Sequence, residues 1–243
     1  MPTVCVLAGG LVSRLGDLTA LRPKPLLEVA GKPFLSHQLA LLRTHGFSDA
    51  VLCVGYLGEL IEEEIGDVCE GMTVRYSYDG PELVGTLGAV RRAAPLLGEQ
   101  FLVLYGDTYL LLDYRRVVDE WTASGDPALM TVLHNRGQWD HSNATYAEGK
   151  VIAYDKFAPS PDMEWIDYGL GGLSASLLDE VPDDEHDLAV LYHVLAIQGL
   201  LHGYPTEQRF FEIGTPAALA ETEAFLLRPA SASPEAGPEA PLT

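Results

Sequence analysis

The chain has 243 residues, 47% of them hydrophobic, which is long enough for one large α/β domain or two small ones. Acidic residues outnumber Lys and Arg by 35 to 15, and the resulting net charge of −20 argues against nucleic acid or an anionic membrane surface as a partner. No apolar run approaches the roughly 18 residues of a membrane span, and the N-terminus lacks a signal-peptide layout, so we expect a soluble, cytoplasmic protein.

In the first half of the chain, apolar strand-like runs alternate with segments of helical spacing. The expected strands cover residues 3–8, 49–55, 72–78 and 101–107, and the expected helices cover 34–46, 57–66, 85–98 and 113–125. Strands that alternate with helices of this length predict βαβ units. We therefore expect an α/β fold with a Rossmann-like, mixed but mostly parallel sheet flanked by helices on both faces.

The second half has a different character. Its expected elements are two short strands around a Glu148-Gly149 turn within 143–157, a long amphipathic helix over 186–203, a strand over 204–214 and a closing helix over 215–228. The last 15 residues are rich in Pro, Ala and Ser and lack an apolar period. The sequence predicts a single domain over 1–228 and a disordered tail over 229–243.

Two glycines follow the first apolar run, in "LAGGLVSRL" at residues 7–15. Glycine lets backbone N–H groups approach a phosphate closely, and Arg14 would add a bidentate charge. Tight turns explain most such glycine pairs, so this segment alone leaves both interpretations open. Residues 1–32 carry a local charge of +2, which favours an anionic ligand at this segment, although six charges can also balance this way by chance.

Two further positions look suited to phosphate chemistry. Lys24 lies between Pro23 and Pro25, which fix the backbone and hold this cation on a rigid segment; a plain surface loop is the alternative. Asp107 ends the apolar run "FLVLYGD", where ligands bind in parallel sheets. A carboxylate there could hold Mg²⁺ together with substrate phosphates, or could simply cap the next turn.

Five segments, taken together, resemble the sugar-1-phosphate nucleotidyltransferases. They are "LAGGLVSRL", "PKP", "GTLGA", "LYGD" and "FFEIGTP", and they occur in the family's order over nearly the whole chain apart from the tail. The resemblance implies a nucleotide-diphospho-sugar transferase fold and an enzyme. The implied reaction joins a nucleoside triphosphate to a sugar 1-phosphate, giving an NDP-sugar and pyrophosphate, with Mg²⁺.

The resemblance also implies roles for particular residues. Arg14 and Lys24 would be catalytic, and Asp107 and Glu212 would hold the metal. Sugar-phosphate binding would fall to Lys156, Asp167 and Gly169. The nucleotide would be bound by Leu7, Ala8, Gly9, Gly10, Gly85, Thr86 and Gly88.

Three residues depart from the family pattern. Val12 replaces a glycine, Glu212 stands where many members have Asp, and Asp167 stands where many have Asn. Val12 would be strained if that position needs a positive φ. Glu212 is one methylene longer, so its role as a ligand is less secure than that of Asp107.

Among short members, the chain looks most like heptose- and mannose-1-phosphate guanylyltransferases, which puts GTP slightly ahead. Uridylyl- or thymidylyltransferases acting on a hexose or muramate 1-phosphate are alternatives. So is a catalytically silent nucleotide-sugar-binding regulatory subunit. A related glycosyltransferase would show a D-x-D motif, and "GDT" at 106–108 lacks the second Asp. A monomer and a homodimer are both compatible with the sequence.

Overall fold

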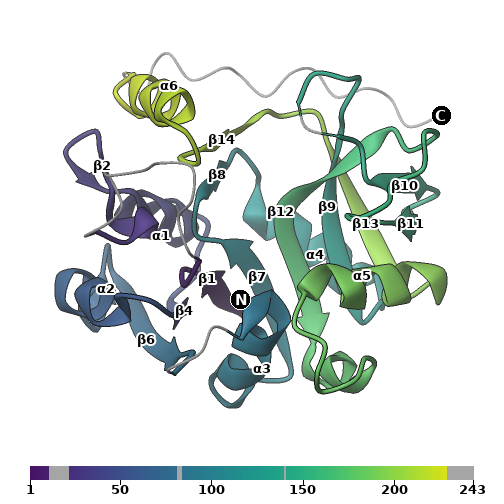
Figure 1. The fold of residues 1–243 in the computed structure, drawn as a ribbon, viewed down its shortest axis with the longest axis horizontal. Coiled ribbons are helices and arrows are strands. Elements are labelled where there is room, and N and C mark those ends of the chain that lie inside the picture. The colour runs from purple at the N-terminus through teal and green to yellow at the C-terminus, as the bar shows by residue number, and fades with distance from the viewer. Residues whose placement is uncertain (11–21, 81–83, 140, 229–243) are drawn as a thin grey trace.

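The computed structural model describes residues 1–10, 22–80, 84–139 and 141–228. Ten strands form one sheet (Figure 1). They are β1 (Thr3–Leu7), β4 (Asp49–Val54), β5 (Val68–Cys69), β6 (Met72–Tyr78), β7 (Gln100–Tyr105), β9 (Ala128–His134), β10 (Ala144–Ala147), β11 (Lys150–Tyr154), β12 (Trp165–Ser174) and β13 (Leu201–Thr206). Their order across the sheet is β10-β11-β13-β9-β12-β7-β1-β4-β6-β5.

The central part of the sheet is parallel. β1 lies between β4 and β7 and runs parallel to both, and β6 runs parallel to β4. β12 lies antiparallel between β7 and β9, and β13 runs parallel to β9. The predicted fold class, a mixed and mostly parallel sheet, is therefore confirmed.

Helices flank the sheet, and one further helix, α6 (Pro216–Leu226), packs against the short strands β14 (Phe210–Glu212) and β2 (Glu28–Val29). The other helices are α1 (Phe34–Thr44), α2 (Gly58–Ile65), α3 (Gly85–Leu97), α4 (Tyr114–Ser124) and α5 (Leu188–Ile197), as far as the described ranges reach. Asp113 and Thr215 cap α4 and α6, because their side chains accept hydrogen bonds from Arg116 N and Ala218 N.

Alternate residues of each central strand face different cores, as the period of a strand requires. Val4 and Val6 pack in one core with residues of α1, α2 and α4. Cys5 packs in the other core with residues of α3 and α5. Burial on both faces explains why these strands are continuous apolar runs. Cys5 and Cys53 are buried free thiols.

Two predicted elements are wrong in part. The helix expected over 186–203 ends at Ile197, because Gly199 adopts a φ of 71° and Leu200 N donates to Leu195 O at 3.0 Å. The chain then enters β13 at Leu201. The strand expected over 204–214 is split, since its first residues end β13 and only Phe210–Glu212 form β14.

Several short elements were not anticipated. They are the hairpin β2 (Glu28–Val29) and β3 (Lys32–Pro33), the strand β8 (Thr108–Leu110), and the 3₁₀ helices η2 (Lys24–Leu26) and η3 (Ala175–Asp179). The pairing of β8 with β14 matters most, because it joins two distant segments: Glu212 pairs with Thr108. This places the late "FFEIG" segment beside the loop that carries Asp107.

Some predictions fall outside what the structure describes. Arg14, Val12 and the tail at 229–243 lie in the undescribed ranges. Across the described ranges, no helix combines the length and the apolarity needed to cross a membrane.

Candidate active site

A hollow opens at the carboxyl end of β1, the edge of a parallel sheet where ligands bind. It contains five of the seven residues predicted to bind the nucleotide. Its lining is Leu7, Gly9, Gly10, Cys53, Asp79, Gly85, Thr86 and Ala89. The strand-end loop and the start of α3 thus face the same space.

The two glycines after β1, Gly9 and Gly10, have different surroundings. A Cβ on Gly9 would lie 2.7 Å from Gly55 N, so a side chain there would collide with the backbone after β4. A Cβ on Gly10 would meet no atom of the described residues within 4 Å. Gly9 therefore permits close packing of two loops, while Gly10 leaves bare backbone facing the hollow, which suits an anionic group.

A second hollow adjoins the first. The two share Leu7, Gly10 and Thr86. The second continues toward the residues expected to carry the chemistry, and its lining adds Ala8, Lys24, Pro25, Tyr105, Gly106 and Asp107. The pair forms one elongated site, with Asp79 at one end and Lys24 and Asp107 at the other.

Lys24 and Asp107 contact each other directly. Nζ of Lys24 lies 2.6 Å from Oδ2 of Asp107, and the lysine side chain is only 19% exposed. Lys24 begins η2, after Pro23 with a φ of −57° and before the buried Pro25. Because prolines fix this segment on both sides, the ammonium group is held in place, as expected from the sequence.

Glu212 lies near this pair. Ile213 N donates to Asp107 O at 3.1 Å, and a Cβ on Gly214 would lie 3.5 Å from both carboxylate oxygens of Glu212 and from Nζ of Lys24. Two carboxylates and one ammonium therefore surround the same small space. The structure brings these three predicted residues together.

This donor set suits Mg²⁺. Within the described part of the chain, no group of three or more His, Cys, Asp and Glu side chains gathers as a metal site. Mg²⁺ is commonly held by only one or two carboxylates together with water and substrate phosphates, so Asp107 and Glu212 fit an ion that arrives with the nucleotide.

Buried contacts fix the loop that carries Asp107. Gly106 N donates to Leu7 O at 3.0 Å. A Cβ on Gly106 would lie 2.8 Å from that same oxygen, so only glycine fits. From α1, the buried Gln38 side chain donates to Tyr105 O and Thr108 O, at 2.9 and 2.7 Å. The loop is thus held on both sides.

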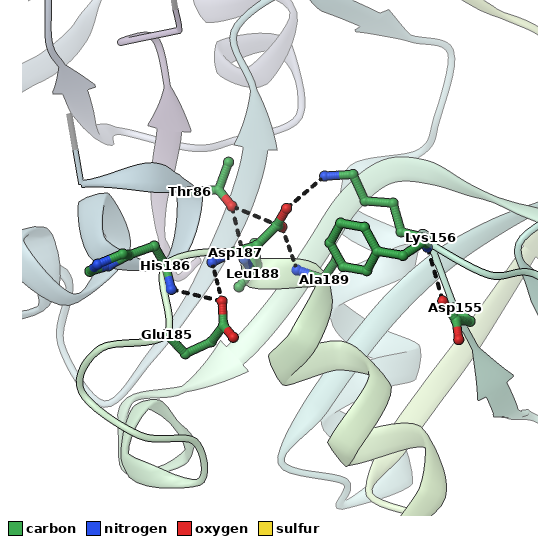
Figure 2. Close-up of polar contacts among 9 residues, drawn as sticks. Thr86, Asp155, Lys156, Glu185, His186, Asp187, Leu188 and Ala189 are labelled. Atoms are coloured by element: carbon green, nitrogen blue, oxygen red, sulfur yellow. Dashed lines mark hydrogen bonds and ion pairs between the residues drawn. The ribbon is translucent and has the colours of Figure 1, made fainter.

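Asp187 links Thr86, which was predicted to bind the nucleotide, to Lys156, which was predicted to bind the sugar phosphate (Figure 2). It caps α5 by accepting a hydrogen bond from Ala189 N, and its carboxylate lies 3.0 Å from Nζ of Lys156. Thr86 Oγ1 donates to Asp187 at 3.3 Å and accepts from Leu188 N at 2.8 Å. Burial raises the pKa of Asp187, but these hydrogen bonds and Lys156 outweigh it, so the net pKa is lowered.

Asp167 lies in β12, on the side of the sheet where Lys156 is found. Burial raises its pKa to about 6, although the Gly169 N–H, Lys156 and Tyr154 all favour the ionised form. Gly169 adopts a φ of 106°, and a Cβ there would lie 3.6 Å from Thr108 Oγ1. Asp167 and Gly169 therefore lie between Lys156 and the loop that carries Asp107.

Gly88 has a different environment from the other nucleotide-side residues. A Cβ there would lie 2.8 Å from the Val84 side chain, and neither hollow includes Gly88 in its lining. Sequence reasoning missed Asp79 and Asp187. Asp187 was placed inside a helix, and its position at the start of the apolar period could have identified it as a cap. Asp79 follows the strand "MTVRYSY", as Asp107 follows its own strand.

Residues 4–202 match the family model described as MobA-like NTP transferase domain, and the chain belongs to this family. The expected resemblance to sugar-1-phosphate nucleotidyltransferases is confirmed, and with it the expectation of an enzyme of this class.

One curated relative is the glucose-1-phosphate cytidylyltransferase of Salmonella typhimurium, 30% identical over 202 residues, which cover 74% of this chain and 77% of the relative. Another is the D-glycero-alpha-D-manno-heptose 1-phosphate guanylyltransferase of Aneurinibacillus thermoaerophilus, 33% identical over 47% of this chain and 50% of the relative. The crystal structure of HddC from Yersinia pseudotuberculosis complexed with GMP-PN has the same fold, with a TM-score of 0.75 at 22% identity over 93% of this chain and 100% of that chain.

Proposed function

We propose that the chain transfers a nucleoside monophosphate from a nucleoside triphosphate to a sugar 1-phosphate, releasing pyrophosphate and an NDP-sugar. The contact between Lys24 and Asp107 carries this proposal, because it puts a held cation and a metal-binding carboxylate at one end of a glycine-lined hollow. A triphosphate needs both kinds of group. The chain's family membership supports the same reaction class.

The reaction needs no general base. An oxygen of the sugar phosphate attacks the α-phosphorus of the triphosphate, and the bond from that phosphorus to the bridging oxygen of the β-phosphate breaks. The nucleophile is already ionised, so the main tasks are to bring two anions together and to stabilise the departing pyrophosphate. Lys24 performs part of the second task by turning its ammonium from Asp107 to the phosphates.

When bound with the nucleotide, Mg²⁺ would supply charge neutralisation on the phosphates, held by Asp107 and Glu212. The carboxylates serve a second purpose before any substrate arrives. Asp107 orients Lys24, since Oδ2 of the aspartate lies 2.6 Å from Nζ of the lysine. Arg14, on the same glycine loop in sequence, would hold the triphosphate.

The sugar 1-phosphate would bind on the side of Lys156. This lysine is 46% exposed and paired with Asp187, so a phosphate can reach it from solvent. Asp167, in its ionised form, would accept hydrogen bonds from sugar hydroxyls. Thr86 contacts Asp187 and also lines the first hollow. It would therefore help to position the nucleotide and the sugar 1-phosphate relative to each other.

For the individual substrates we propose GTP and a heptose or mannose 1-phosphate. A guanylyltransferase relative that acts on a heptose 1-phosphate supports this choice. A relative that is a cytidylyltransferase acting on glucose 1-phosphate shows that the same fold serves other pairs.

A substrate panel tests the proposal. The full chain would be incubated with Mg²⁺, each of GTP, UTP, CTP, ATP and dTTP, and the 1-phosphates of mannose, glucose and a heptose, while pyrophosphate is measured. We expect release that needs both substrates and stops when EDTA is added. Absence of release with every pair would overturn the reaction class. Release with a pair other than GTP and a heptose or mannose 1-phosphate would overturn only the finer assignment.

A further inference from the structure

Asp79 is a buried carboxylate at the end of the elongated site opposite Lys24 and Asp107. It directly follows β6, and its N–H donates to Val54 O at 2.9 Å. The residue is only 5% exposed, yet it lines the first hollow beside the glycine loop. A Cβ on Gly9 would lie 3.2 Å from its Oδ2, which confirms how near the carboxylate is to that loop.

One oxygen of this carboxylate, Oδ1, has no hydrogen-bond partner among the residues that the structure describes. Burial raises the pKa of Asp79, and the charge of Arg92 on α3 partly offsets this. Leaving a buried acceptor unpaired is unfavourable, because its contacts with water are lost and not replaced. Such groups are rare in native proteins, and a functional role that supplies the missing donor is one explanation for them.

The location of Asp79 indicates which part of a nucleotide supplies that donor. The phosphates belong at the end that holds Lys24 and Asp107, which is in the second hollow. Asp79 lies only in the first hollow, together with the apolar side chains of Leu7, Cys53 and Ala89. A planar base fits between such apolar walls, with its polar edge toward the carboxylate.

The chemistry of the bases then narrows the choice, because an ionised carboxylate only accepts hydrogen bonds. Guanine presents two adjacent donors on its Watson–Crick edge, N1–H and the 2-amino group. Uracil and thymine present one N–H between two carbonyl oxygens, which would repel the carboxylate. Cytosine and adenine place a ring-nitrogen acceptor next to their amino group.

We infer that Asp79 is the residue that selects guanine, by accepting hydrogen bonds from N1–H and the 2-amino group of GTP. This inference rests on the proposed function and narrows its nucleotide to one base. It gives the unpaired Oδ1 a partner when substrate is bound. It also assigns a specificity-determining role to a residue that takes no part in phosphoryl chemistry.

The first test uses the unaltered protein and compares GTP with inosine triphosphate, which lacks only the 2-amino group. With the best sugar 1-phosphate of the panel, we expect kcat/KM for GTP to exceed that for inosine triphosphate by roughly 10-fold or more. Equal values, or a preference for a pyrimidine triphosphate, would overturn the inference while leaving the proposed reaction intact. No turnover with any triphosphate would instead overturn the proposed function.

The second test changes the residue. Asp79→Asn keeps the shape but replaces one acceptor with a donor, so the ratio of kcat/KM for GTP to that for UTP should fall by roughly 10- to 100-fold. Asp119→Asn, an exposed position on α4, serves as the matched control and should leave the ratio unchanged. An equal loss with every triphosphate would indicate a ribose-binding or structural role and overturn the inference. If the Asp79 variant does not fold, the inosine comparison decides alone.

Discussion

Lys24 and Asp107 are separated by 83 positions in the chain, yet their side chains form a partly buried ion pair of 2.6 Å. Each comes from a segment that is independently fixed, Lys24 by two prolines and Asp107 by the contacts of Gly106 and Gln38. The pair holds a cation and a carboxylate in contact at one end of the site, and we expect a bound triphosphate to draw the ammonium of Lys24 from Asp107 to its phosphates.

Replacing Lys24 with Ala should reduce kcat for pyrophosphate release by about 100- to 1000-fold, since a pre-placed donor to the developing charge is lost. Lys32→Ala is the matched control, because Lys32 forms an exposed ion pair with Glu70 on the surface. Steady-state kinetics on both variants provide the measurement. Similar kcat values for the two would contradict the assigned role of Lys24.

Replacing Asp107 with Asn should lower kcat by a similar factor and raise the Mg²⁺ concentration needed for half-maximal activity, because one charged ligand is lost. Glu212→Gln should shift the same Mg²⁺ dependence less strongly. The measurement is a magnesium titration of the rate at saturating substrates. Glu120→Gln, which alters an exposed pair with Arg116 on α4, provides the control. Near-normal turnover in the Asn variant would refute the metal assignment.

Replacing Asp187 with Ala should have two separate effects. Loss of the cap of α5 should destabilise the protein by about 1 kcal/mol, visible as a lower urea midpoint. Loss of the partner of Lys156 should also change KM for the sugar 1-phosphate. Thr215→Ala removes the cap of α6 and should reproduce only the first effect. A Thr215 variant with the same KM change would show that Asp187 acts through stability alone.

Asp167 should make stability depend on pH, because burial raises its pKa from 3.8 to about 6 in the folded state. A raised carboxyl pKa means that the folded state binds the proton more tightly than the unfolded state. Its contribution to stability is therefore greatest below about pH 4 and is lost as the pH rises through 6.

Asp167→Asn removes this titration. The variant should be more stable than the unaltered protein at pH 8, by about 3 kcal/mol at most, and the difference should shrink toward pH 4. Thermal unfolding of both proteins across this pH range provides the measurement, and the same measurement on Asp119→Asn, at an exposed position, provides the control. If the stability difference between the unaltered protein and Asp167→Asn did not vary with pH, the assignment of Asp167 to a buried site that raises its pKa would be contradicted.

The sequence predicted the elements whose signals are local. β1, β4 and β7 are largely continuous apolar runs, β6 is rich in β-branched and aromatic residues, and α4 and α6 begin at recognisable caps. The strands β9 and β12 were missed. β9 is a single seven-residue run, ALMTVLH, and β12 contains three glycines and a register shift between Asp167 and Gly171, so neither has a clear period.

The sequence identified individual residues of the site, but it did not show which of them lie close together. The motifs indicated Lys24, Asp107 and Glu212 separately. Their proximity depends on the pairing of β8 with β14, which no local sequence pattern predicts. Asp79 and Asp187 escaped notice because their significance lies in burial and in partners distant along the chain.

The hydrogen bond from Gly106 N to Leu7 O has a consequence for how such an enzyme could diversify. It is made by main-chain atoms, so it ties the loop that carries Asp107 to the end of β1, which lines both hollows, whatever side chains surround them. Residues such as Asp79 can then be exchanged without displacing Lys24 or Asp107. One scaffold can therefore acquire a new nucleotide preference by a local change, while the machinery that breaks the phosphoanhydride bond is inherited intact.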